Sequence, residues 1–308
     1  LNEKQLHINK QGRGDTAVVL LSGPTDNWHS DSAWFARLQT ALSDRYTSYA
    51  LDMPGFGGSS SEQGPDYLAF ADDVGALLEV IPQQRVLLLG FASSNLTVLK
   101  LFDTNTQTQK VAGVMLLDPD VLTEFSIARY RADAEPFYKQ KDAYLEYIAA
   151  GKYTPRVKQK NELDLQVLKD LSKMPSTSGE GGDQIDWPLV DKVFAARETI
   201  NGQQATFKMV ANYYQNLDRA LALQRRVTLD PAMPLAILNT DFENSYLDGA
   251  DEESRKGLEQ WRDDGDTWMQ TLCQGRTACR YVPIADKHHL VPFSHPDIIR
   301  AELQLMDE

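Results

Sequence analysis

The chain of 308 residues has little cysteine, few basic side chains and no long apolar run. No stretch of about 18 consecutive apolar residues occurs, which excludes a membrane-spanning helix. The 31 Lys and Arg residues stand against 44 Asp and Glu, a net charge of −13. This shortage of positive charge argues against general binding to nucleic acid or to an anionic membrane, because both require clustered cations. A small molecule is therefore the expected partner, and no feature indicates an oligomeric state.

The two cysteines, Cys273 and Cys279, lie six residues apart in the polar segment CQGRTAC. A turn at Gly275 would bring the thiols together, and two free thiols on a loop are the other interpretation. A disulfide favours the periplasm or secretion, whereas free thiols favour the cytoplasm. The spacing does not match a Cys/His zinc cluster, so we expect no metal. The chain begins with Leu1 rather than Met, which fits a processed or trimmed N-terminus.

Apolar runs of strand length alternate with helical patterns through the first part of the chain. The pattern predicts strands at 17–23, 46–52, 85–90 and 111–118, with helices at 31–44, 65–81 and 93–102. Asp31 is placed to cap the first of these helices. This alternation is typical of a parallel sheet covered by helices on both faces.

The alternation stops at about residue 119, and the chain is mostly helical and polar as far as residue 230. We interpret 119–230 as an inserted helical cap or lid. The core pattern then resumes with strands and a final helix at 234–239, 279–284 and 295–306. The expected fold is therefore α/β, a mostly parallel central sheet flanked by helices, with a core formed by 1–118 and 231–308.

Four segments resemble the motifs of the α/β-hydrolase superfamily, in the order and spacing of that family. LLSGPTDNW (20–28) corresponds to the oxyanion loop, LDMPGFGGSS (51–60) to the Asp-x-Pro-Gly segment, GFASS (90–94) to the nucleophile elbow and KHHLVPFSHP (287–296) to the catalytic-histidine segment. The resemblance covers nearly the whole chain. It implies the α/β-hydrolase fold and an ester or related acyl substrate cleaved by Ser-His-acid chemistry, without a cofactor.

The elbow segment departs from the family at its central position. Gly90 and Ser94 fill the small-residue positions, which places Ala92 in the slot of the nucleophile. Alanine has no atom that can attack a carbonyl carbon. Ser93 lies one residue past the apex, so we expect its N–H, rather than its hydroxyl, to contribute to an oxyanion hole.

The resemblance implies a histidine base and a carboxylate partner near the end of the chain. His289 stands seven residues before Pro296, the interval seen in the family, and imidazole exchanges a proton near neutral pH. Counting from the strand at 234–239 makes Glu243 the first choice for the acid and Asp241 the alternative. Asp118, directly after the preceding strand, is a third possibility.

The oxyanion loop contains a second departure. Pro24 follows Gly23, and proline has no N–H to donate, so Thr25 is the expected second donor beside Ser93. Ligands of open α/β sheets bind beyond the carboxyl ends of the strands. The residues expected to line that substrate site are Ser22, Gly23, Trp28 and Phe91.

Three functional hypotheses follow from these residues. In the first, the protein is a carboxylesterase-like serine hydrolase in which Ala92 has replaced the nucleophile and inactivated it. In the second, alanine is native and the protein binds a small ligand without turnover, an interpretation that Pro24 favours. In the third, the fold carries a lyase or a cofactor-free oxygenase, because the fold does not fix the chemistry.

Overall fold

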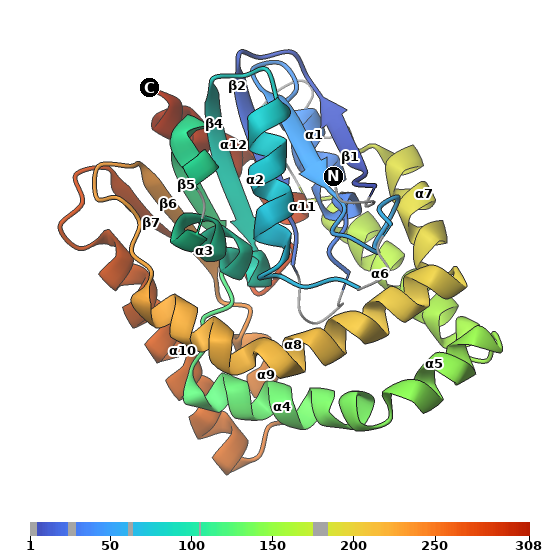
Figure 1. Cartoon of the computed structure of the whole chain (residues 1–308). Coiled ribbons are helices and arrows are strands. Elements are labelled where there is room, and N and C mark those ends of the chain that lie inside the picture. The colour runs from blue at the N-terminus through green and yellow to red at the C-terminus, as the bar shows by residue number, and fades with distance from the viewer. Residues whose placement is uncertain (1–4, 24–28, 61–63, 105, 175–183) are drawn as a thin grey trace.

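The computed structural model describes residues 5–23, 29–60, 64–104, 106–174 and 184–308. At its centre is a seven-stranded sheet with the strand order β1-β3-β2-β4-β5-β6-β7 (Figure 1). The strands are β1 (Ile8–Gln11), β2 (Thr16–Leu21), β3 (Thr47–Leu51), β4 (Arg85–Phe91), β5 (Val111–Leu117), β6 (Leu235–Thr240) and β7 (Cys279–Ile284). Only β1, which pairs antiparallel with β3, departs from a parallel arrangement. The predicted mostly parallel sheet is therefore confirmed.

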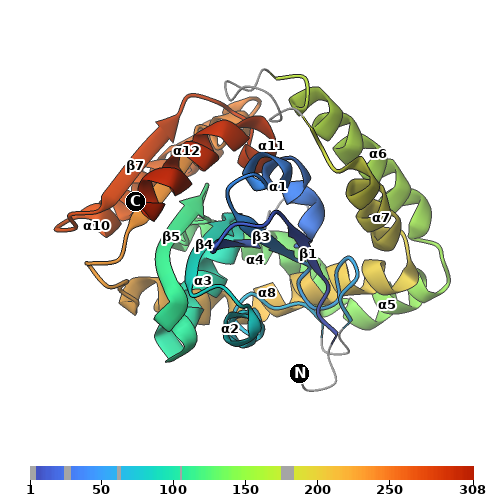
Figure 2. The same cartoon turned by 90° about the horizontal axis from the view of Figure 1, so that it is seen from above.

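Helices cover both faces of the sheet. One face carries α1 (Ala36–Leu42), α11 (Val291–Ser294) and α12 (Pro296–Asp307), and the other carries α2 (Phe70–Val80) and α3 (Asn95–Thr104), as Figure 2 shows. Side chains alternate between the two layers along β2. Val19 packs in the core cluster that contains α2 and α3, whereas Val18 and Leu20 pack in the cluster with α1 and α12. This burial on both faces explains the unbroken apolar runs of the strands.

The segment between β5 and β6 is mostly helical, as predicted for residues 119–230. It contains α4 (Glu124–Lys139), α5 (Lys141–Ala149), α6 (Thr154–Leu171), α7 (Trp187–Arg197) and α8 (Ile200–Arg226). Figure 1 shows α4 and α8 lying across one end of the sheet. After β6 the chain forms α9 (Asn244–Leu247) and α10 (Glu252–Cys273), and short 3-10 turns η1 (Ser32–Phe35), η2 (Ala92–Ser94) and η3 (Thr106–Lys110) occur elsewhere.

A buried ion pair connects Arg197, the last residue of α7, to Asp31, which precedes η1. Arg197 donates from Nε and Nη2 to the two carboxylate oxygens of Asp31, each at 2.9 Å, and both side chains are almost fully buried. The guanidinium also lies over the rings of Trp34 and Phe194, at 4.6 and 3.9 Å from their centres. Asp31 in addition caps η1 by accepting a hydrogen bond from the N–H of Ala33, which confirms its predicted capping role.

A disulfide joins Cys273, the last residue of α10, to Cys279, the first residue of β7. The disulfide interpretation of the two cysteines is thus confirmed. None of the helices in the described part of the chain has the length and apolar character that crossing a membrane requires.

Replacing Arg197 should destabilise the protein strongly, because Asp31 would then be a buried carboxylate without its counter-charge. We expect Arg197→Met to lower the free energy of unfolding by about 3–5 kcal/mol in urea denaturation. The matched control is Asp44→Asn, which breaks the exposed pair between Arg300 and Asp44 and should cost less than about 1 kcal/mol. Equal losses of unfolding free energy in the two variants would show that the buried pair stabilises the protein no more than the exposed pair does.

Candidate active site

The turn between β4 and α3 has the strained geometry of a nucleophile elbow. Ala92 has a φ of 53°, a left-handed value that costs an L-residue about 1–2 kcal/mol. The hydroxyl of Ser94 holds the turn in place by donating to the carbonyls of Leu21 and Phe91, at 2.7 and 2.9 Å. The methyl group of Ala92 therefore stands at the apex, where it lines a pocket.

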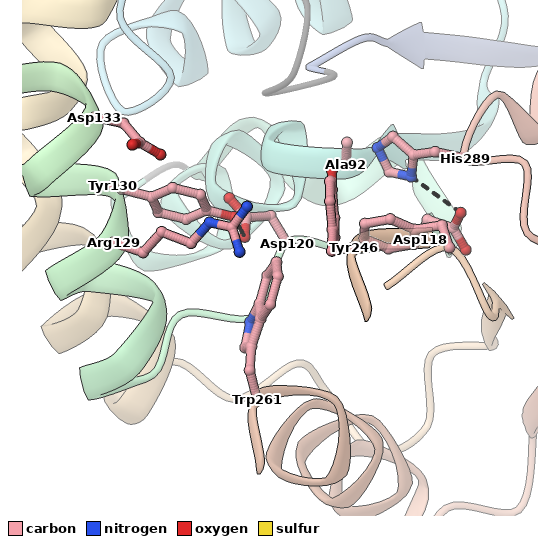
Figure 3. Close-up of a pocket in the computed structure, with 10 residues that line it drawn as sticks. Ala92, Asp118, Asp120, Arg129, Tyr130, Asp133, Tyr246, Trp261 and His289 are labelled. Carbon is pink, nitrogen blue, oxygen red and sulfur yellow. Dashed lines mark hydrogen bonds and ion pairs between the residues drawn. The ribbon is translucent and has the colours of Figure 1, made fainter. Parts of the chain in front are cut away.

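The ring of His289 lies in the same pocket and is oriented by Asp118. His289 Nδ1 is 3.1 Å from Asp118 Oδ2. Asp118 also accepts hydrogen bonds from the N–H and the hydroxyl of Thr240, at 2.6 and 2.7 Å. An ionised carboxylate can only accept hydrogen bonds, so its contact with His289 requires that Nδ1 carry the hydrogen. Nε2 is then the unprotonated, basic nitrogen of the ring. Figure 3 shows Nε2 pointing toward Ala92.

Two phenylalanine rings fix the plane of the imidazole. The ring centre of His289 is 5.1 Å from that of Phe91, which precedes the elbow, and 4.2 Å from that of Phe242, which follows β6. Phe91, predicted to line the substrate site, is fully buried, packs against the imidazole and is not among the residues that line the cavity. Its contact with the ligand would be indirect, through the histidine.

The carboxylate bonded to His289 differs from the one expected first. Asp118, the third candidate, makes this contact, and neither Glu243 nor Asp241 does. Strands β5 and β6 are neighbours, and the side chain of Thr240 at the end of β6 donates to Asp118 at the end of β5. This bond holds the Asp118 carboxylate at the strand ends, within reach of His289. Asp241 is exposed, with its N–H bonded to the carbonyl of Asp286.

Glu243 lies close to this pair without joining it. It precedes α9, and its Oε2 is buried without a hydrogen-bond partner among the described residues. Burial raises its pKa to about 8, and the nearby negative charge of Asp118 adds to this shift. At neutral pH the side chain is therefore a neutral carboxylic acid beside the hydrogen-bonded pair of His289 and Asp118, rather than the partner of the imidazole.

The expected oxyanion donor is already engaged. The N–H of Ser93 donates to the carbonyl of Gly23 at 3.0 Å, so in this conformation it does not point at a ligand oxygen. A side chain at Gly23 would collide with the backbone nitrogen of Ser94, only 2.5 Å from the Cβ position, which explains the glycine. Ser22 is buried, with its hydroxyl unpaired within the described part of the chain. Thr25 and Trp28 lie outside the described residues.

Asp120 is a site residue that the sequence patterns did not single out. Its carboxylate accepts hydrogen bonds from three hydroxyl groups, those of Ser93 and Tyr213 at 2.7 Å and that of Tyr130 at 2.9 Å. Burial raises the pKa of this carboxyl. Because Tyr130 belongs to α4 and Tyr213 to α8, Asp120 joins both helices to the residue after the elbow apex. Its position two residues after Asp118 is the signal that could have indicated it.

These side chains enclose a cavity of about 290 Å³. The residues that line it, most of them labelled in Figure 3, are Ala92, Asp118, Asp120, Arg129, Tyr130, Asp133, Phe242, Tyr246, Trp261 and His289. The walls are thus aromatic with several charged groups. Within the described ranges no cluster of three His, Cys, Asp or Glu side chains is arranged to hold a metal ion. The site can position a small molecule between a basic imidazole and an aromatic wall.

The mostly parallel sheet with helices on both faces is the architecture of the α/β-hydrolase fold. Residues 18–302 match the model of the alpha/beta hydrolase family, and the chain belongs to this family. No curated protein sequence matches it.

Solved structures show the same fold at low sequence identity. A candidate epoxide hydrolase from Pseudomonas aeruginosa is 16% identical, with a TM-score of 0.61 over 98% of this chain and 91% of that one. The epoxide hydrolase CorEH is 14% identical, with a TM-score of 0.61 over 100% and 96% of the two chains. A thermophilic esterase from Thermogutta terrifontis is 14% identical, with a TM-score of 0.55 over 97% and 91%.

The raised pKa of Glu243 predicts a pH-dependent stability difference. Below about pH 4.5 this carboxyl is protonated in both the folded and the unfolded chain. As the pH rises toward 8, the unfolded chain releases the proton while the folded chain retains it, so the folded state loses stability. Relative to Glu243→Gln, the parent should lose on the order of a few kcal/mol between pH 5 and 8. Urea denaturation across this range measures the difference, and parallel curves for the two proteins would contradict the assignment.

Proposed function

We propose that this site belongs to a serine hydrolase that cleaves esters or related acyl compounds, with the attacking serine at position 92 in the active form. The observation that carries the proposal is the orientation of His289. Its Nδ1 is bonded to Asp118, and its Nε2 points toward the apex methyl group of Ala92. A hydroxyl attached to that methyl carbon would face a base that is already oriented by a carboxylate.

The proposed reaction follows from these positions. His289 Nε2 takes the proton of the serine hydroxyl as the oxygen attacks the acyl carbon, and it then gives the proton to the leaving alcohol. Water attacks the resulting acyl-enzyme with the same base and restores the serine. Asp118 holds the tautomer and stabilises the imidazolium that forms in each half. With Ala92 no covalent intermediate can form, so the chain as sequenced is inactive by this route.

The remaining parts of the proposal concern the residues around this pair. Stabilisation of the oxyanion by the N–H of Ser93 requires the Gly23 carbonyl to turn away when substrate binds. We also assign 119–230 the role of a cap, because Arg129, Tyr130 and Asp133 of α4 contribute to the cavity wall. The cap would then determine which acyl groups fit.

A second candidate function is binding of a small ligand without turnover. The observation that favours it is the hydrogen bond from the N–H of Ser93 to the carbonyl of Gly23, which uses a donor that acyl transfer needs. The two functions predict different results for a serine at position 92, which are ester hydrolysis for the first and ligand binding without hydrolysis for the second.

Introducing that serine tests the proposal directly. We expect Ala92→Ser to hydrolyse p-nitrophenyl esters with a kcat at least about a thousandfold above that of the chain as sequenced, since the covalent route becomes available. Adding His289→Ala should abolish this gain. If Ala92→Ser binds ester analogues in the cavity but leaves their hydrolysis unchanged, the binding function is supported instead.

The identity of the acid can be tested in the Ala92→Ser background. Asp118→Asn should lower kcat by roughly 10³- to 10⁴-fold, because an amide favours the wrong imidazole tautomer. Glu243→Gln is the matched control, since it changes a nearby carboxyl that does not bond to His289, and it should change kcat by less than about tenfold. The reverse order of effects would make Glu243 the functional acid.

A further inference from the structure

Arg129, which has no counter-ion among the described residues, lines the cavity on its α4 side. Arg129 extends from α4 into the cavity, and its guanidinium lies 5.0 Å from the centre of the Tyr246 ring (Figure 3). Apart from this contact, it makes no hydrogen bond or ion pair with any of the described residues. It is half-buried, so part of its hydration has been replaced by the face of an aromatic ring.

Other enclosed arginines of this protein have oxygen partners. Arg197 pairs with Asp31, whereas Arg37 and Arg276 donate to backbone carbonyls. A guanidinium keeps its charge at all relevant pH values and presents a planar fork of donors that matches a carboxylate. In the described part of the chain, the fork of Arg129 is directed into the cavity rather than at a protein oxygen.

A continuous aromatic wall leads from the reacting end of the cavity to this guanidinium. The ring of His289 lies against Phe242 at 4.2 Å, Phe242 meets Tyr246 at 6.2 Å, and Tyr246 carries Arg129 on its face. A ligand extended along this wall would have one end at the apex methyl of Ala92 and the other at Arg129. Its middle would lie along these rings, which suits a short aliphatic chain, and would pass Asp120, whose carboxylate is engaged by its hydroxyl donors.

Within the described residues, none of the acidic groups that line the cavity forms an ion pair with this arginine. Asp118 is engaged by His289 and Thr240, and Asp120 accepts its three hydroxyl donors. Asp133 lies one helical turn after Arg129 on α4 and is exposed, with no ion pair to it. A carboxylate such as that of Asp133 would favour a cationic ligand. Replacing Asp133 therefore tests whether the cavity selects cations rather than anions.

We propose that Arg129 binds a carboxylate at the end of the substrate remote from the scissile bond. The substrate class is then an acyl compound that carries a second, free carboxylate, such as a half-ester of a short dicarboxylic acid. This inference rests on the proposed hydrolase function and specifies its substrate.

Binding to the chain as sequenced tests the inference independently of turnover. Titration calorimetry would compare monomethyl adipate with the neutral ester in which the free carboxylate is replaced by a primary amide. We expect the anion to bind roughly tenfold to a hundredfold more tightly, as for a hydrogen-bonded charge pair. Arg129→Gln should remove this preference, and Arg129→Lys should retain part of it because the charge remains without the fork.

Asp133→Asn is the matched control and should leave binding of the anion equal or tighter. Equal affinity for the acid and the amide, or an anion preference that survives in Arg129→Gln, would overturn the inference. A third probe, the same ester with a primary amine in place of the free carboxylate, would also overturn the inference if it bound more tightly than the acid and Asp133→Asn abolished that preference.

Turnover in Ala92→Ser separates this inference from the proposed function. Hydrolysis of both the acid and the amide ester at equal kcat/KM would sustain the hydrolase and overturn the role of Arg129. Anion binding that depends on Arg129, without hydrolysis in the serine form, would sustain the carboxylate site and overturn the hydrolase.

Discussion

The hydrogen bond between His289 and Asp118 connects the loop after β7 to the end of β5, and the organisation of the site depends on it. Asp118 has a left-handed φ of 39°, and Thr240 at the end of β6 donates to both of its carboxylate oxygens. Three neighbouring strand ends therefore meet at one carboxylate. This arrangement fixes which ring nitrogen carries hydrogen and leaves the other directed at Ala92, beyond the carboxyl ends of the strands, where open α/β sheets bind ligands.

Strain is concentrated at the same place. Ala92 and Asp118 are the two non-glycine residues with a left-handed φ in the described part of the chain, and they face the same cavity. Glycine would adopt this conformation at the apex without cost, whereas alanine retains the strain and supplies only a methyl group. An alanine in a strained turn opposite an oriented imidazole fits the loss of a single oxygen atom from a working nucleophile. The N–H of Ser93 becomes available to an oxyanion only when its hydrogen bond to the Gly23 carbonyl breaks.

Much of the fold followed from the sequence because the inner strands β2, β4, β5 and β6 are buried on both faces and form nearly unbroken apolar runs. Strand β1 was not predicted because three of its four residues, INKQ, are polar and it lies partly exposed at the sheet edge. The elbow and His289 could be located from local spacing. The partner of His289 could not, because the choice among Asp118, Asp241 and Glu243 depends on which strand end lies nearest to the imidazole. The same limit applies to Asp120 and Arg197, whose partners lie on elements distant in sequence.

The central claim is that position 92 is the site of covalent attack, and labelling tests it most directly. The Ala92→Ser protein would be treated with a fluorophosphonate, digested, and its peptides sequenced by mass spectrometry, beside the parent chain. The account predicts one phosphonylated residue, Ser at position 92, with no label in the parent. Absence of label in the serine form, or label on Ser93 or Ser94 in both proteins, would contradict it.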